Sequence, residues 1–120
     1  MSVTSARCIG FDVGDTLLEY AGIPLSWESY YPEALNALAN AWSVRPDAGQ
    51  MAEADARLKR FNTRIHPRVA EVRFEEIATR IANIFGFDGG WNEAEAARVF
   101  FSVFQQSLRC FPDTLRTLIV

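Results

Sequence analysis

Apolar residues recur at intervals of three and four along the middle of the chain, which is the spacing of amphipathic helices. The spacing predicts four helices, which run from about Ser26 or Pro32 to Trp42, from Asp47 to a stop at Pro67, from about Arg73 to Phe85, and from Asn92 to about Leu108. Because each helix has one apolar face, we expect the four to pack on one another as a bundle.

The residue types at the predicted helix ends fit these boundaries. Asp47 and Gln50 have the spacing of a capping box, and Asn92 is placed to cap the fourth helix while Glu95 returns the bond. Gly86 is placed to end the third helix in a left-handed conformation. The aromatic residues of the helical region are interpreted as packing residues rather than ligand contacts.

The two ends of the chain have a different pattern. Ala6–Val13 is a mostly apolar run that ends in Gly14-Asp15, which predicts a buried strand that reaches a tight turn. Phe111–Val120 begins as a helix with Pro112 at its first position and ends in apolar residues with no capping signal, as a truncated segment would. No alternating pattern between Leu25 and Leu108 predicts a second strand. The fold class is therefore mainly α with one N-terminal strand.

Composition narrows the possible functions. The chain has 120 residues, 49% of them hydrophobic, and a formal net charge of −3. With Lys59 as its one lysine, it lacks the clustered positive charge that nucleic-acid binding needs, so we expect no nucleic-acid partner. No apolar run approaches the roughly 18 residues of a membrane span, so we expect no membrane partner and a cytoplasmic location. Cys8 and Cys110 lack metal-ligand spacing and are interpreted as small buried hydrophobes, with a disulfide between them as the alternative.

The candidate chemistry lies where the predicted N-terminal strand ends. Asp12 places a carboxylate there, and ligands of α/β folds bind at the carboxyl ends of strands. Burying such a carboxylate is costly unless it binds a cation, accepts backbone hydrogen bonds or acts as a nucleophile. Gly14 leaves room for a substrate or metal, and Thr16 could orient the loop or contact a phosphoryl oxygen.

Phe11–Leu17 resembles the first motif of the haloacid dehalogenase-like (HAD) hydrolases, which is an apolar strand, a nucleophilic Asp, a second Asp two residues on, and Gly-Thr-Leu. Phe111–Leu118 resembles the Pro-Gly/Asp-x-x-x-x-Leu helix by which these proteins return from an inserted helical cap. The resemblance implies that residues 1–18 and 109–120 are parts of a HAD-like α/β (Rossmann-like) core. Residues 19–108 would then be the helical cap, a four-helix bundle.

The resemblance also implies roles for the loop residues. Asp12 would be the nucleophile of a Mg²⁺-dependent phosphohydrolase and a ligand of the metal, Gly14 would supply a second ligand through its carbonyl, and the substrate would be a small phosphorylated metabolite. Gly14 stands where the family has its acid/base Asp, and Asp15 is one position late. Without that acid, departure of a poor leaving group slows by roughly 10²–10⁴. An acyl phosphate or a halide would suffer less, so dehalogenase-like chemistry stays an alternative.

The family's remaining catalytic groups are a Ser or Thr, a Lys or Arg, and an acidic pair, and all would lie beyond Val120. We therefore expect the 120-residue chain to be truncated and inactive by itself. The alternative is a non-catalytic helical oligomerisation or ligand-binding module. Because the predicted strand would have two unpaired edges, we also expect a homodimer or a larger homo-oligomer.

Overall fold

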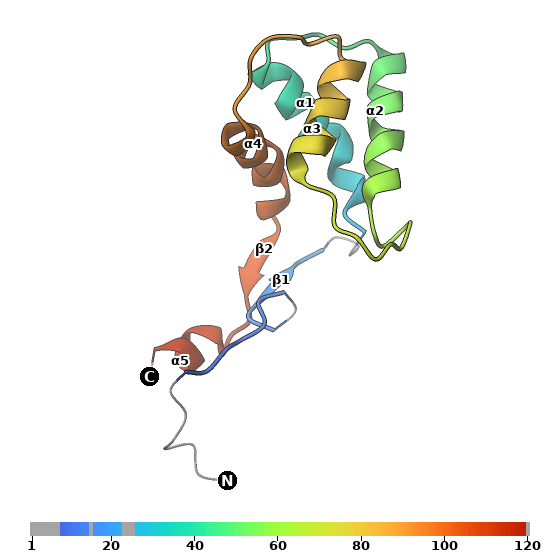
Figure 1. Ribbon diagram of the computed structural model, residues 1–120. Helices are drawn as coiled ribbons and strands as arrows, with labels where there is room; N and C mark the ends of the chain where they lie inside the picture. The colour runs from blue at the N-terminus through green and yellow to red at the C-terminus, as the bar shows by residue number, and fades with distance from the viewer. Residues whose placement is uncertain (1–7, 15, 23–25, 120) are drawn as a thin grey trace. The chain divides into compact units, whose positions relative to one another are not determined.

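The computed structural model of the protein describes residues 8–14, 16–22 and 26–119 (Figure 1). Its elements in chain order are β1 (Leu18–Tyr20), the 3₁₀ helix η2 (Glu28–Tyr30), α1 (Tyr31–Ala41), α2 (Ala48–Phe61), α3 (Phe74–Ile84), α4 (Glu93–Gln105), β2 (Leu108–Cys110) and α5 (Thr114–Leu118). The chain divides into two compact units. We call Ile23–Gln106 the helical unit, and Met1–Gly22 together with Ser107–Val120 the strand unit.

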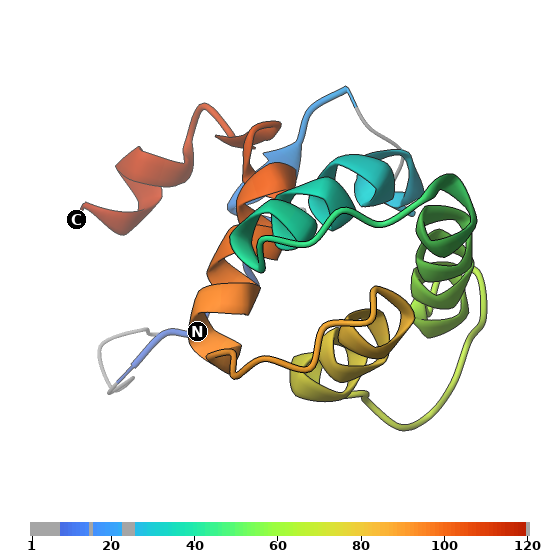
Figure 2. The same ribbon diagram turned by 90° about the horizontal axis from the view of Figure 1, so that it is seen from above.

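The helical unit is a closed arrangement of four helices. α1 packs on both α2 and α4, and α3 packs on the same two helices from the other side (Figures 1 and 2). Each helix therefore buries its apolar face against two neighbours, which is what the spacing of apolar residues predicted. The prediction of a mainly helical fold is confirmed.

The core of the helical unit combines fully buried aliphatic side chains with clusters of aromatic side chains. Leu35, Leu38 and Ile81 are its largest fully buried side chains. Phe104 of α4 has three aromatic neighbours from η2 and its surroundings, Trp27, Tyr30 and Tyr31, at ring-centroid distances of 5.6, 6.0 and 6.3 Å. The aromatic side chains near η2 are therefore packing residues of α1 and α4, as interpreted from the sequence.

Three predicted helix-end signals are present. In the capping box of α2, the Gln50 amide donates to Asp47 Oδ1 at 2.8 Å and the Asp47 amide donates to Gln50 Oε1 at 2.9 Å. Gly86 follows α3 with φ of 68°, and Asn92 Oδ1 accepts the Glu95 amide at 3.0 Å. The return bond from the Glu95 carboxylate is not among the hydrogen bonds that the described residues make, so the second half of that capping box was predicted wrongly.

Other helix boundaries differ from the prediction. α2 ends at Phe61 rather than at Pro67, because Asn62 has extended backbone and its side-chain amide bonds elsewhere. Asn62 Nδ2 donates to the Tyr31 hydroxyl at 2.6 Å, and Asn62 Oδ1 accepts the Arg64 amide at 2.9 Å. α4 ends at Gln105 rather than Leu108, because the residues that follow pair as β2. α5 begins at Thr114, so Pro112 precedes this helix instead of opening it.

The strand unit is built on a two-stranded antiparallel sheet. β1 pairs with β2 in the register Leu18↔Cys110, Glu19↔Arg109 and Tyr20↔Leu108. The pairing extends past both ends of the strands, since the Ala21 amide donates to the Ser107 carbonyl at 2.8 Å and the Phe111 amide donates to the Leu17 carbonyl at 3.2 Å. The segment that contains the four long helices thus leaves one strand and returns into its neighbour.

The N-terminal strand predicted over Ala6–Val13 is wrong for the residues that the structure describes. Residues 8–13 have no regular secondary structure and are exposed, with Ile9 at 67% and Val13 at 54% of full exposure. Ala6 and Arg7 lie outside the described residues. A β-strand forms only when a neighbouring strand exchanges backbone hydrogen bonds with it. In this protein β2 exchanges those hydrogen bonds with β1. The antiparallel pair thus replaces the single buried strand.

The structure also bears on the interpretation of the two cysteines and on the search for a membrane span. Cys8 and Cys110 are free cysteines, and both are exposed, so the interpretation as buried hydrophobes is wrong. Neither forms the disulfide that was the alternative. No helix within the described ranges combines the length and apolar character needed to cross a membrane.

Candidate functional site

The candidate site is the loop between Asp12 and β1. The Val13 carbonyl accepts hydrogen bonds from the amides of Thr16, Leu17 and Leu18 at 3.4, 3.0 and 3.1 Å. Three amides on one acceptor force the chain into a tight turn directly after Asp12. Asp15, a predicted loop residue, lies outside the described residues.

Asp12 is the residue on which the predicted chemistry depends. Thr16 Oγ1 donates to Asp12 Oδ2 at 3.4 Å, so the structure brings together these two predicted site residues. The Asp12 side chain is exposed, whereas the sequence predicted a carboxylate at the end of a buried strand. Water therefore solvates the charge, and burial alone does not demand a bound cation at Asp12.

Gly14 lies beside Asp12 at the head of the turn. A Cβ atom built there would meet nothing within 4 Å, and the positive-φ glycines of the described residues are Gly22 and Gly86. Neither crowding nor a left-handed backbone therefore requires glycine at position 14 here. What Gly14 offers to a ligand is its backbone carbonyl.

The described residues only partly fit the Mg²⁺ ion that the resemblance implies. Mg²⁺ takes octahedral oxygen coordination, with one or two carboxylates completed by water and substrate phosphates. Among the described residues of the loop, the Asp12 carboxylate and the Gly14 carbonyl are oxygens of that kind. Among the described residues, no group of three or more His, Cys, Asp and Glu side chains is placed to hold a metal. They do not by themselves form a complete magnesium site.

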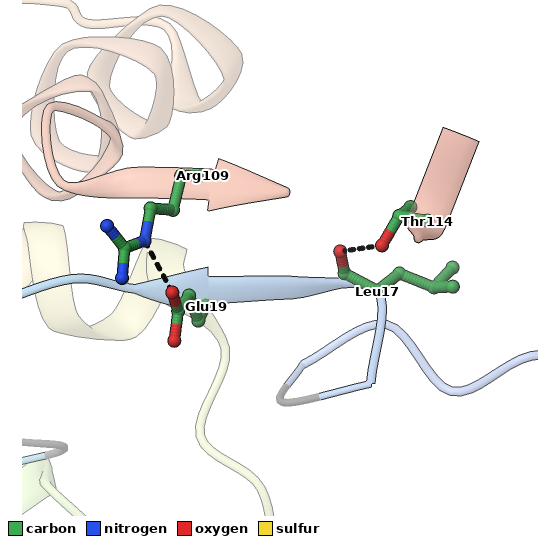
Figure 3. Close-up of polar contacts among 4 residues, drawn as sticks. All are labelled: Leu17, Glu19, Arg109 and Thr114. Carbon is green, nitrogen blue, oxygen red and sulfur yellow. Dashed lines mark hydrogen bonds and ion pairs between the residues drawn. The ribbon is translucent and has the colours of Figure 1, made fainter. Parts of the chain in front are cut away.

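The end of the loop is held by the start of α5. The Leu17 carbonyl accepts the Thr114 hydroxyl at 2.7 Å (Figure 3). The same carbonyl also accepts the Phe111 amide. Thr114 is only 4% exposed, so its hydroxyl bonds in a site shielded from water. Two residues further along the chain, an ion pair joins Glu19 of β1 to Arg109 of β2 (Figure 3).

Thr114 is a site residue that the sequence did not single out. It follows Pro112-Asp113 at the start of a short helix, and its side chain looks like any other hydroxyl in the sequence. Its position opposite Leu17 results from the β1–β2 pairing, and its hydrogen bond joins positions 97 apart along the chain. The sequence Pro-Asp-Thr at the start of a helix only weakly predicts that the threonine hydroxyl will bond to a distant strand.

Comparison with known proteins leaves the family open. No family model, no curated protein and no solved structure matches this chain. The HAD resemblance therefore depends on the residues of Phe11–Leu17 and Phe111–Leu118 themselves.

Removing the Thr114 hydroxyl should loosen the end of the loop. We expect Thr114→Val to cost about 1 kcal/mol, which lowers the protection of the Ala21 and Phe111 amides roughly fivefold in hydrogen exchange. Thr117→Val is the matched control, because Thr117 also donates to a backbone carbonyl, that of Asp113 at 2.9 Å, but is exposed. Equal losses of protection in the two variants would contradict the anchoring role of Thr114.

Proposed function

We propose that this chain carries the nucleophile loop and the inserted helical cap of a HAD-like phosphohydrolase, with Asp12 as the nucleophile. One observation carries the proposal. The two stretches that bear the resemblance are 97 positions apart at Leu17 and Thr114, and they are joined by the bonds to the Leu17 carbonyl. The resemblance implies a helical cap inserted just after the nucleophile strand, with the Phe111–Leu118 helix returning to the core, and the bonds at Leu17 support this layout.

The chemistry proposed for Asp12 is phosphoryl transfer in two steps. A carboxylate oxygen attacks phosphorus, a new O–P bond forms, and the bond to the leaving oxygen breaks. Water then attacks the aspartyl phosphate, which releases inorganic phosphate and restores the carboxylate. The Thr16 hydroxyl bonds to Oδ2, so Oδ1 is the oxygen that remains for the attack. Magnesium stays part of the proposal, with Asp12 and the Gly14 carbonyl as its ligands from this loop.

The loop also restricts the substrate class. Gly14 has no side chain to protonate a departing alkoxide at the position where the family has an Asp. A small metabolite whose leaving group needs no proton, such as an acyl phosphate, therefore fits the loop better than a sugar phosphate does. Carbon–halogen cleavage needs no such proton either, and it remains the second chemistry open to Asp12.

We expect no turnover of p-nitrophenyl phosphate or acetyl phosphate by the 120-residue chain with Mg²⁺. Among the described residues, no ion pair brings a cationic side chain to Asp12, and such a charge is what stabilises a transferring phosphoryl group. Release of phosphate is the measurement. Turnover by this chain would overturn the expectation.

The product of the whole natural reading frame tests the proposed function itself. If that frame continues beyond Val120, its product should hydrolyse acetyl phosphate with Mg²⁺ and stop when EDTA is added. An inactive product of a longer frame would reject the enzyme. A reading frame that ends at Val120, together with no turnover by its product, would also reject the proposed enzyme. That outcome would favour a non-catalytic module.

A second candidate function, self-association, is favoured by apolar side chains exposed on the strand unit. They come from the segment before the loop and from the chain around α5, and are Ile9, Phe11, Val13, Leu115, Leu118 and Ile119. Soluble monomers seldom expose large contiguous apolar patches, and exposed apolar side chains of this kind are typical of interaction surfaces. We propose that two copies, or more, cover them in a homo-oligomer.

Light scattering at micromolar concentration should give at least twice the mass of one chain. The double variant Phe11→Ser/Leu115→Ser should shift the mass toward the monomer, because it removes apolar area that association would bury. Val69→Ser is the control, since Val69 is fully exposed on the helical unit. A monomeric parent chain would contradict self-association.

A further inference from the structure

The helical unit contains a cavity that is separate from the Asp12 loop. It has a volume of about 370 Å³ and lies between the end of α1, the loop from α3 to α4, and the start of α4. Its wall includes Trp42 from the end of α1, Phe87 and Trp91 from the loop, and Glu95 from the first turn of α4. We call it the tryptophan pocket. Its volume suits a small molecule rather than a polypeptide segment.

The aromatic walls of the tryptophan pocket are held in place by one another. Trp42 and Phe87 stack with ring centroids 5.2 Å apart and an angle of 5° between their planes. Trp91 lies 5.8 Å from Trp42 at 49°, so its ring is inclined to the stacked pair. A Cβ atom at position 89 would come within 2.8 Å of the Phe87 ring, so Gly89 permits this ring position. The rings therefore form a largely prearranged surface.

The Glu95 carboxylate makes no hydrogen bond or ion pair with the residues that the structure describes. Gln50 holds the same position in the first turn of α2, and its side chain accepts a hydrogen bond from the amide of the capping residue Asp47. In α4, only the backbone amide of Glu95 bonds to the capping residue Asn92. Glu95 is also absent from the ion pairs that the described residues form. Its carboxylate is exposed and lines the tryptophan pocket.

Glu95 is the one charged residue among the described residues that line the pocket. The segment Ile81–Ala97 also contains Asp88 and Glu93, and Arg80 and Arg98 flank this segment. Glu93 lies 3.9 Å from Arg73, which is 78% exposed and does not line the pocket. Aromatic faces and a neighbouring carboxylate both attract positive charge, and a trimethylated ammonium is the cation that aromatic faces bind best relative to water.

We propose that the tryptophan pocket binds a small organic cation of the quaternary ammonium class. The cation lies against the ring of Trp91 and the part of Trp42 that lines the pocket, and Glu95 balances its charge at the rim. This inference does not depend on Asp12, because the two sites are in different units and share no residue. It gives the helical unit a binding function of its own whether or not the chain belongs to an enzyme.

Choline and 3,3-dimethylbutan-1-ol test the charge requirement, since the alcohol has a carbon atom where choline has its charged nitrogen. The indole N–H signals of Trp27, Trp42 and Trp91 report binding by NMR, and Trp27 does not line the pocket. In the 120-residue chain at constant ionic strength, choline should shift the Trp42 and Trp91 signals saturably. The alcohol should leave them in place. Equal shifts with both compounds, no shift with choline, or an equal shift of Trp27 would overturn the proposal.

Two matched variants test the carboxylate. Glu95→Gln should weaken choline binding roughly twofold to fivefold, the range expected for one partly solvated charge contact. Glu93→Gln removes the same charge two residues away and should change binding less than about 1.5-fold, because salt and water screen it.

A third variant tests the aromatic wall. Trp91→Leu keeps an apolar wall and should abolish saturable binding. Unchanged binding in Glu95→Gln or in Trp91→Leu would reject this cation site.

Discussion

Replacing Leu38 by alanine is expected to lower the free energy of unfolding by about 2–5 kcal/mol. Leu38 is fully buried in α1, the helix that packs on both α2 and α4. The substitution removes apolar atoms from contact with those neighbours and leaves a cavity that the surrounding backbone cannot fill. For a chain whose total stability is of the usual order, about 5–15 kcal/mol, this loss is a large fraction.

Urea unfolding followed by far-ultraviolet circular dichroism measures the effect on the helices. Val69→Ala is the matched control, because Val69 also loses apolar atoms but is fully exposed in a loop of the same unit. Its free energy of unfolding should stay within about 0.5 kcal/mol of the parent chain. Similar midpoints for Leu38→Ala and the parent would mean that α1 is not central to the packing of the helical unit.

The helices could be predicted because the signals that define them are local. The apolar faces of α1 to α4 repeat within each segment, and the capping box of Asp47 and Gln50 spans three residues. Gly86 likewise acts within its own turn. Local signals determine where a helix begins, but α2 ended early because Asn62 bonds to Tyr31, a residue of another helix. That contact depends on packing, which no segment reveals by itself.

The sheet could not be predicted because it depends on pairing between residues that are far apart in the sequence. Ile9–Val13 has the composition of a buried strand, yet the residues that pair are Leu18–Tyr20 and Leu108–Cys110. Each of these strands has three residues, too few to establish an alternating pattern. Their pairing closes a long loop through the helical unit, and the Glu19–Arg109 ion pair becomes recognisable only once the register is known.

The candidate site was predicted in part. The motif Phe11–Leu17 placed Asp12 and Thr16 in one short loop, and the two residues share a hydrogen bond. The sequence also predicted a buried carboxylate at Asp12, but this side chain is exposed. Burial of Asp12 depends on which strands flank residues 8–13, and the motif carries no information on that. Thr114 was missed because its role is set by the distant carbonyl of Leu17.

The second large effect concerns Asp12 in the product of the whole reading frame. Under the proposed function, Asp12→Asn is expected to lower turnover of acetyl phosphate by at least about 10³-fold, because an amide does not attack phosphorus and loss of the proposed nucleophile would remove the covalent route. The substitution conserves size, and the asparagine oxygen can still accept the Thr16 hydroxyl. The loop should therefore keep its conformation while losing its chemistry.

Three comparisons separate nucleophilic attack from other roles of Asp12. Acid quenching during turnover should trap a phosphoryl group on the parent enzyme, released by hydroxylamine as an acyl phosphate would be, and none on Asp12→Asn. Thr16→Val removes only the long hydrogen bond to Oδ2 and should slow turnover by roughly twofold to tenfold. Asp113→Asn removes an exposed carboxylate next to α5 and should leave turnover unchanged. If Asp12→Asn still forms the trapped species, the nucleophile lies elsewhere in the protein.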